Sequence, residues 1–310
     1  MKSKAKTAAA AVPKAPLKRR LKDNWQLYLL LLIPLVLTFI YKYIPMYGIQ
    51  IAFRDYKASR GILGSRWVGM EWFERFFSAP TCARMIRNTV LLSFFSLLWS
   101  FPVPIILSLC INQLRFARYK RVVQTVLYAP HFISTMVVCG MIRIFLSPSG
   151  GLINLLMHTS IDFLTESSAF RTIYIASGIW QDAGWGCIIY LATLSAVDTS
   201  LYEAAKVDGA SVFQRIMAID VPALLPMAIL NLIMSAGSLM NVGFEKVWLL
   251  QTDLNKATSD VIAVYVYQQG IENAKYSYST AVGLFNTAVN LILLIVVNQI
   301  ASRASDVDFI

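Results

Sequence analysis

Charged residues are scarce in this sequence of 310 residues. They make up 15% of it, whereas hydrophobic residues make up 57%, and soluble domains carry about 25% charged residues. This deficit excludes an ordinary soluble domain and indicates a membrane protein. The pattern predicts an all-α, polytopic membrane protein with six transmembrane helices, because six apolar runs approach the roughly 20 residues that a helix needs to cross a bilayer. These runs are residues 27–48, 88–111, 122–146, 172–195, 224–244 and 280–300.

Residues that carry chemistry are also few. The four cysteines are dispersed, and the two histidines, His131 and His158, lie far apart, so no metal-binding spacing is present. The sequence has no Gly-x-x-x-x-Gly-Lys-Ser/Thr loop to hold nucleotide phosphates, and no Ser/His/Asp set for nucleophilic catalysis. We therefore expect no catalytic residue, no metal and no cofactor bound by this chain, which argues against an enzyme.

The net charge of +11 is concentrated near one end of the sequence. Residues 1–24 contain eight lysines and arginines among alanines and prolines. Without interleaved aromatic residues or a folded module, this tail does not indicate a nucleic-acid partner. The positive-inside rule instead places it in the cytoplasm, and with that orientation 15 basic residues fall in cytoplasmic segments against seven in the first outer loop. We predict a basic cytoplasmic tail over residues 1–24 and a six-span transmembrane domain over residues 25–310.

A polar segment, residues 199–222, separates the fourth and fifth runs on the cytoplasmic side in this orientation. Ser200 and Glu203 have the Ser-x-x-Glu spacing of a capping box, and Gly209 suits the left-handed position after a short helix. Ser211 begins a second spacing of this kind, Ser-x-x-Gln. The pattern predicts two short capped helices with a glycine joint. Capping alone fits a connecting loop and a rigid docking element equally well.

The same segment resembles a known loop. Glu203-Ala204-Ala205, Gly209 and Pro222 are similar in identity and spacing to the EAA loop of binding-protein-dependent ABC importer permeases. Asp220 departs from that family's pattern, in which the approach to the proline is less acidic. The resemblance implies a maltose-permease-like fold whose coupling helix docks on a separate ATPase. The residues that it assigns to ATPase coupling are Ser200, Glu203, Ala204, Ala205, Asp208, Gly209 and Pro222.

The resemblance also implies a location and partners. It implies a multi-pass protein of the bacterial cell membrane, in contact with membrane lipid. Its partners would be a second, related permease subunit, two cytoplasmic ATPase subunits that bind ATP and Mg, and an extracytoplasmic solute-binding protein.

Other segments resemble one branch of that family. Asn88-Thr89, Tyr128-Ala129-Pro130-His131-Phe132-Ile133-Ser134 and Thr258-Ser259-Asp260-Val261 look like the polysaccharide or multiple-sugar (LplB-like) branch of carbohydrate importer permeases. The resemblance implies a permease subunit that forms half of a translocation path for oligosaccharides or polysaccharide fragments. The alternative is a stand-alone secondary transporter or channel for a polar solute, for which Asp182 would be the candidate ion-coupling residue.

Polar and aromatic residues inside the last three runs are candidates for a sugar path. Amides can bond sugar hydroxyls and aromatic faces can stack on sugar rings, whereas the alternative is that amides bond across helices. Asp182 either faces a hydrated cavity or pairs with Arg143. Pro130 is expected to kink the third run, as a flexible gate or a packed bend, and we expect the packed bend. The candidate path residues are Trp180, Asp182, Tyr190, Asn231, Asn241, Phe244, Asn286 and Asn290.

Overall fold

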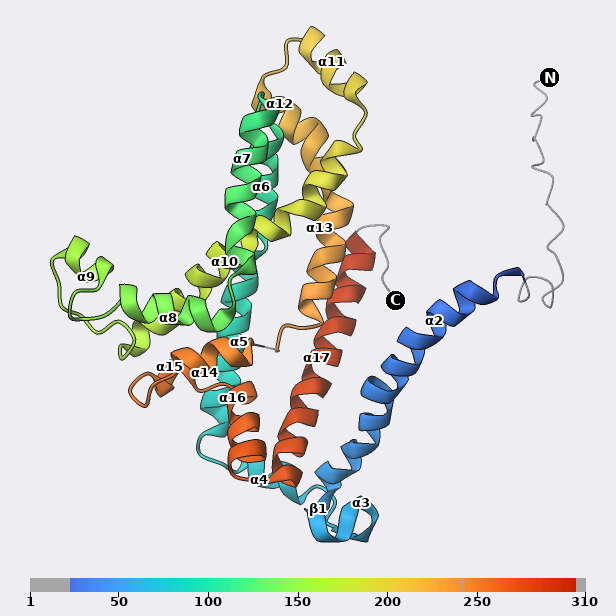
Figure 1. The fold of residues 1–310 in the computed structure, drawn as a ribbon, viewed down its shortest axis with the longest axis vertical. Helices are drawn as coiled ribbons and strands as arrows, with labels where there is room; N and C mark the ends of the chain where they lie inside the picture. The colour runs from blue at the N-terminus through green and yellow to red at the C-terminus, as the bar shows by residue number, and fades with distance from the viewer. Residues whose placement is uncertain (1–22, 241, 305–310) are drawn as a thin grey trace. The chain divides into compact units, whose positions relative to one another are not determined.

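The computed structural model describes residues 23–240 and 242–304, so the predicted basic tail lies almost wholly outside the described residues. The chain divides into two units, residues 1–50 and 51–310. The first contains helix α2, Trp25–Thr38, which continues through a π-helical stretch, η1, Phe39–Tyr43, into a 3-10 helix, η2, Ile44–Phe53 (Figure 1). The last three residues of η2 belong to the second unit.

The second unit is built from long helices. Helices α5, Cys82–Ser100, and α6, Pro102–Asn112, form one continuous span. Helix α10 is Ser167–Ser195, helix α13 is Val221–Ala236 and helix α17 is Tyr276–Ala304. Helix α10 packs against α6 and α13, and α13 packs against α17. The mostly helical fold predicted from the sequence is confirmed.

The span count needs separate treatment. Over the described residues, four continuous helices are long and apolar enough to cross a membrane, and a bent pair of helices brings the number to five. Helix α10 has 29 residues, which is length enough for a span, but Gln181 and Asp182 lower its hydropathy. The prediction of a protein with several transmembrane helices is therefore supported, while the number six stays a prediction.

The third apolar run is broken. Helix α7, Ala117–Tyr128, leads through a 3-10 turn, η4, Ala129–Phe132, to helix α8, Thr135–Phe145, and the axis bends by 96° at the break. The kink that the sequence predicts near Pro130 is present, and it divides the run over residues 122–146 into two helices. Pro130 has no backbone N–H. Just after it, the Val137 N–H donates to the Ser134 side chain, and the Ile133 carbonyl accepts a hydrogen bond from the Gln181 side chain at 2.8 Å.

The fifth run also ends early. Helix α13 stops at Ala236 rather than at residue 244, and the chain turns away before helix α14, Phe244–Leu250. The side-chain oxygen of Asn290 accepts a hydrogen bond from the Met240 backbone N–H at 2.7 Å. An amide of α17 thus satisfies the unwound backbone that the membrane would otherwise leave unpaired.

The remaining elements are short. They are the strands β1, Arg54–Lys57, and β2, Ser65–Trp67, and the helices η3, Ala58–Arg60, α3, Gly61–Gly64, α4, Glu71–Phe77, α9, Leu152–Met157, α11, Thr199–Val207, α12, Val212–Arg215, η5, Ile216–Asp220, α15, Lys256–Ser259, α16, Ile262–Tyr267, and η6, Gln268–Glu272. The strands pair antiparallel, with Arg54 opposite Trp67. This hairpin is a small departure from an all-α fold.

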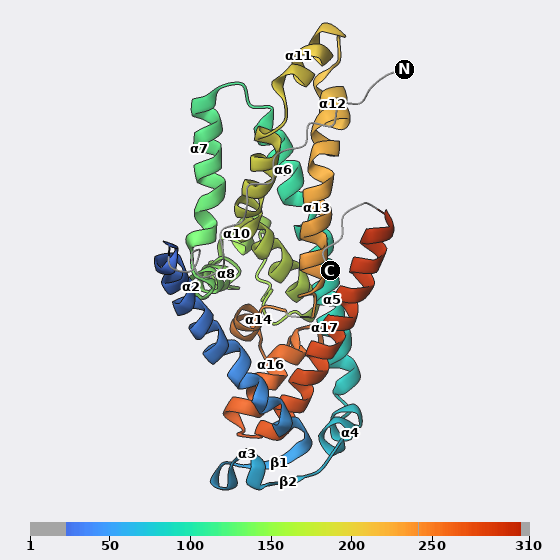
Figure 2. The ribbon, with the colours of Figure 1, turned by 90° about the vertical axis from the view of Figure 1, so that its right-hand side faces the viewer.

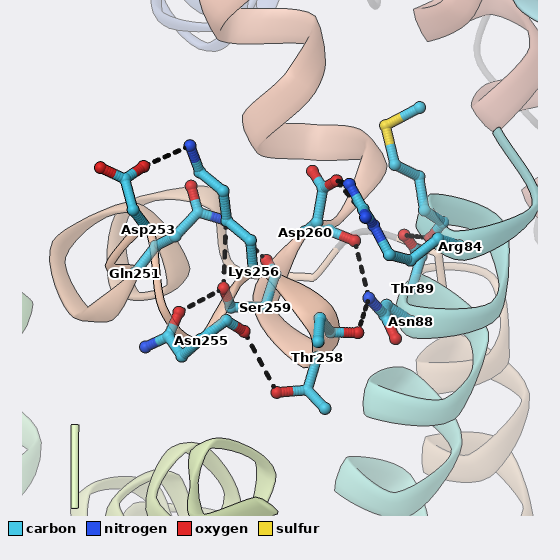
Figure 3. A network of polar contacts seen from close by, with 12 residues as sticks. Arg84, Asn88, Thr89, Gln251, Asp253, Asn255, Lys256, Thr258, Ser259 and Asp260 are labelled. Atoms are coloured by element: carbon cyan, nitrogen blue, oxygen red, sulfur yellow. Dashed lines mark hydrogen bonds and ion pairs between the residues drawn. The ribbon is translucent and has the colours of Figure 1, made fainter. Parts of the chain in front are cut away.

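A polar network fixes the loop between α14 and α16 onto α5 (Figure 3). Arg84 donates to the Asp260 carboxylate at 2.8 Å, and the Asn88 side chain donates to the backbone carbonyls of Ala257 and Asp260. Asn255 is fully buried and donates to the Leu250 carbonyl at the end of α14. Because buried polar groups must be paired, this loop holds α14 in a defined position.

Candidate functional site: an exposed helical segment and a polar cavity

The 199–222 segment lies at the end of the second unit that is opposite the β1–β2 hairpin (Figures 1 and 2). Helix α11 has no buried residue. Val207 is 88% exposed and Phe213 is 71% exposed. Both apolar side chains therefore lie largely open on this segment.

Helix α11 is not capped in the way that the sequence suggested. Its N-cap is Asp198, whose side chain accepts a hydrogen bond from the Ser200 backbone N–H at 2.9 Å. The capping box predicted for Ser200 and Glu203 is wrong, because with this N-cap Glu203 lies in the second turn, beyond reach of the free N–H groups. Asp is itself a preferred N-cap, so Asp198 was the signal to follow. The same hydrogen bond lowers the pKa of the Asp198 carboxyl.

The joint and the second cap agree with the sequence prediction. Gly209 has φ +74°, and a Cβ built there would meet nothing within 4 Å. The residue is therefore required for its backbone conformation rather than for space. Ser211 and Gln214 form a capping box with both hydrogen bonds present. These two predictions are confirmed.

Asp220 joins this segment to the helices beneath it. Its side chain is fully buried; one carboxyl oxygen accepts a hydrogen bond from the Tyr202 hydroxyl of α11, and the other accepts from the Gln113 side chain, just after α6, at 2.9 Å. Burial raises the pKa of Tyr202 to about 12, and the hydrogen bond to Asp220 adds to the shift. The Asp220 carboxyl group therefore links α11 to the end of α6 and to the start of α13.

The other residues that the resemblance assigned to coupling are surface residues of the same segment. Glu203, Ala204, Asp208 and Gly209 are exposed, as are Ser200 and Pro222, and Ala205 is half-buried. The segment thus presents a small-residue face with acidic groups on a rigid support. Sequence reasoning had noted Asp220 only as a departure from the family pattern. Its buried position beside Tyr202 explains why an acid stands there.

A cavity of about 690 Å³ lies among α5, α10, the bend between α7 and α8, and the start of α14. One stripe of α10 faces it, Tyr174, Gly178 and Asp182, each four residues apart. Ser96, Ser134 and Phe244 line it from other elements. Hydroxyl groups, charged groups and an aromatic ring therefore converge on one space.

The bend contributes a His–Asp contact to this cavity. His131 Nδ1 lies 2.9 Å from an Asp182 carboxylate oxygen, and the His131 ring stacks on Trp185 with centroids 4.5 Å apart. Arg143 instead donates to the Leu249 carbonyl. The predicted choice for Asp182 is resolved in favour of the cavity, because its partner is His131 rather than Arg143.

Lys246 was missed by sequence reasoning. It lies on α14, lines the cavity, and is only 8% exposed. Its ammonium nitrogen lies 5.0 Å from the centroid of the Tyr174 ring, whose hydroxyl accepts a hydrogen bond from the Gly243 backbone N–H. Lys246 lies just beyond residue 244, the predicted end of the fifth run, and was therefore expected to lie in an outer loop rather than in a cavity.

The predicted path residues divide between the cavity and other places. Asp182 and Phe244 line the cavity. Tyr190 is buried in a cluster with Leu194 and Leu224, and Asn231 is half-buried outside the cavity. Asn286 and Asn290 bond the Met240 backbone, as the cross-helix alternative expected. Trp180 is exposed outside the cavity, and Asn241 lies outside the described residues.

Within the part of the chain that is described, no three or more His, Cys, Asp or Glu residues gather so that they could hold a metal. The cavity lining offers hydroxyl groups, charged groups and aromatic ring faces, which suit a polar ligand. The exposed segment places Val207 and Phe213 on the surface of two short helices. Both features belong to the second unit.

Comparison with known proteins gives consistent matches. The family model described as "Binding-protein-dependent transport system inner membrane component" matches residues 77–306. Protein LplB of Bacillus subtilis (strain 168) is 43% identical over 293 residues, which cover 93% of this chain and 91% of LplB. The polygalacturonan/rhamnogalacturonan transport system permease protein YteP of the same organism is 43% identical over 281 residues, which cover 89% of this chain and 88% of YteP.

Solved structures are similar as well. The crystal structure of a bacterial ABC transporter involved in the import of the acidic polysaccharide alginate matches with a TM-score of 0.84 and 38% identity, covering 93% of this chain and 98% of the other. A second structure, with the same TM-score, identity and coverage, is of a bacterial alginate ABC transporter in complex with an alginate pentasaccharide-bound periplasmic protein.

Proposed function

Because this chain belongs to the family of binding-protein-dependent transport system inner membrane components, we propose that it is the permease subunit of an ATP-driven importer of oligosaccharides or polysaccharide fragments. The chain is a transport component rather than an enzyme. Two relatives support a carbohydrate cargo, since YteP is named for polygalacturonan and rhamnogalacturonan and the solved transporter imports alginate.

The observation that carries the proposal is the exposed 199–222 segment, which is attached to the neighbouring helices through the buried side chain of Asp220. In the proposed mechanism, ATP-driven closure of two ATPase subunits moves α11, and the Tyr202–Asp220–Gln113 link transmits this movement to α6 and α13. Those helices border α10, which lines the cavity. A rigid connection of this kind lets one event switch a path between two access states.

The proposed assembly has four further chains. A second permease subunit completes the path, two cytoplasmic ATPase subunits bind ATP and Mg, and an extracytoplasmic solute-binding protein delivers the saccharide. The periplasmic protein in one of the matched transporter structures supports the last of these. The proposal also places the N-terminus and the 199–222 segment in the cytoplasm of a bacterial cell.

The test is a pair of glycine substitutions with the same backbone strain at different places. Gly209 and Gly150 both have positive φ, +74° and +84°, and open space around them. Gly209→Val costs roughly 1 kcal/mol or more of local backbone strain, and we expect it to reduce ATPase co-purification and saccharide uptake. Gly150→Val, in the turn after α8, carries the same strain, and we expect both activities to persist.

Membrane insertion of both variants is measured alongside. Full uptake with a stoichiometric ATPase in the Gly209→Val protein would contradict the assignment of this segment to coupling. Equal losses in the two variants would show that the strain acts on folding rather than on docking.

A further inference from the structure

The cavity contains a buried cation without a matching anion. Lys246 is 8% exposed, and no ion pair within the described ranges includes it. Its ammonium group rests against the Tyr174 ring, 5.0 Å from the centroid, and 3.5 Å from where a Cβ on Gly178 would stand. Burying an unpaired charge costs free energy, and a charged residue within a membrane domain usually marks a functional site.

The nearby acids do not fill this role. The Asp182 carboxylate is paired with His131 at 2.9 Å. Glu245 also lines the cavity, but its side chain is exposed and forms no ion pair with Lys246, since successive helical side chains do not face each other. Arg143, on the neighbouring helix α8, donates to the Leu249 carbonyl and does not line the cavity. Lys246 is thus the cation that the cavity offers to a ligand.

The surroundings describe the rest of that ligand. Ser96, Ser134 and the Tyr174 hydroxyl line the same cavity, and the Ser96 hydroxyl is buried without a hydrogen-bond partner among the described residues. Phe244 contributes an aromatic ring to the same lining, with its centroid 4.6 Å from that of the Tyr267 ring. Hydroxyl partners, a ring face and one ammonium group match a sugar ring that carries a carboxylate.

From this arrangement, and given the proposed function, we propose that Lys246 binds the carboxylate of the transported saccharide, so that the substrate class is uronic-acid-containing oligosaccharides. Between substrates, the Tyr174 ring shields the ammonium group. A cation–π contact of this kind is weak enough to be exchanged for a carboxylate. Since a transport site must also release its ligand, one ammonium group with a replaceable partner suits it better than a permanent ion pair.

The test compares an acid with its neutral ester in the assembled importer in membrane vesicles. A reporter cysteine replaces Ser100, another cavity residue, and is labelled with a water-soluble thiol reagent. The protein without this reporter supplies the background from Cys110, which is exposed. Digalacturonate and its dimethyl ester then compete with labelling. We expect the acid to protect at concentrations about tenfold lower than the ester, because charge-assisted hydrogen bonds are the stronger ones.

Variants assign that preference to one residue. We expect Lys246→Gln to remove the preference for the acid and Lys246→Arg to keep it. Lys256→Gln is the matched control, since Lys256 pairs with Asp253 outside the cavity, and we expect the preference to remain. If Lys246→Gln fails to assemble, Lys246→Met takes its place.

The outcomes separate the two proposals. Equal protection by acid and ester in the parent protein would overturn the carboxylate site and leave a carbohydrate path in place. A preference that survives Lys246→Gln would overturn the role of Lys246. No protection by either compound, with a cysteine that only lipid-soluble reagents reach, would overturn the sugar path itself.

Discussion

Removing one hydroxyl group tests how the 199–222 segment is attached. Tyr202→Phe deletes the O–H that donates to the buried Asp220 carboxyl group and leaves the hydrogen bond from Gln113 in place. A hydrogen bond to a buried charged group contributes about 1.5–3 kcal/mol, which corresponds to roughly a 10- to 150-fold change in the equilibrium between attached and detached α11. We expect a detached α11 to move without moving α6 and α13.

The assay is the ratio of ATP hydrolysed to saccharide transported, measured in proteoliposomes with the complete importer. We expect this ratio to rise in the Tyr202→Phe protein while hydrolysis persists. The result is expected to be the same from pH 6 to 9, because Tyr202, with a pKa of about 12, stays protonated and remains a donor. Tyr119→Phe is the control, since Tyr119 is exposed on α7 and its hydroxyl has no partner in the described part of the chain.

A double-mutant cycle with Asp220→Asn identifies the path of transmission. If Tyr202 acts through Asp220, the effects of the two substitutions are expected to be less than additive. An unchanged ratio in Tyr202→Phe, matching Tyr119→Phe, would refute the reasoning, and so would strictly additive effects.

Two further predictions concern packing and capping. A Cβ on Gly184 would lie 1.9 Å from the Leu127 carbonyl oxygen, so Gly184→Ala is expected to destabilise the protein in detergent by about 1–3 kcal/mol, as an overpacked contact does. Gly140→Ala is the control, since a Cβ there meets nothing within 4 Å, and we expect its melting temperature to be unchanged. Equal melting temperatures of the two variants would disprove the close approach of α7 and α10. The lowered pKa of Asp198 means that its cap is fully present above the ordinary carboxyl pKa of about 3.9 and is lost as the pH falls through the folded value. Hydrogen exchange at the Ser200 amide, corrected for intrinsic rates, is therefore expected to show steady protection from pH 8 to about 4 and a loss below it. We expect Asp198→Asn to stay protected and Asp198→Ala to be unprotected throughout.

The sequence predicted the parts of the fold that depend on local patterns. Long apolar runs gave helices, and the left-handed Gly209 and the capping box at Ser211 followed from residue type and spacing. The cap of α11 was misplaced because Ser200 and Glu203 have the spacing of a capping box, whereas the N-cap is Asp198, two positions earlier.

The parts that escaped prediction depend on contacts between distant residues. The end of α13 at Ala236 is stabilised by amides from α17, 46 and 50 residues away from Met240 in sequence. The sharp break after Tyr128 is tolerated because Gln181, on another helix, bonds the freed Ile133 carbonyl. Both unwound stretches, the bend between α7 and α8 and the segment between α13 and α14, border the cavity. Because their positions depend on contacts between distant residues, the sequence did not predict that Lys246 lines the cavity.

The five-residue turn that joins α12 to α13, Ile216–Asp220, is π-helical. A turn of this kind accommodates one residue more than the α-helix on either side of it, and each residue of an α-helix advances the chain by about 100° around the axis. The number of residues in the turn therefore sets the direction in which α11 lies around the axis of α13. It also sets whether Tyr202 can reach Asp220. Shortening it by a single residue would point the surface that we propose docks on the ATPase in another direction, without altering any side chain on that surface.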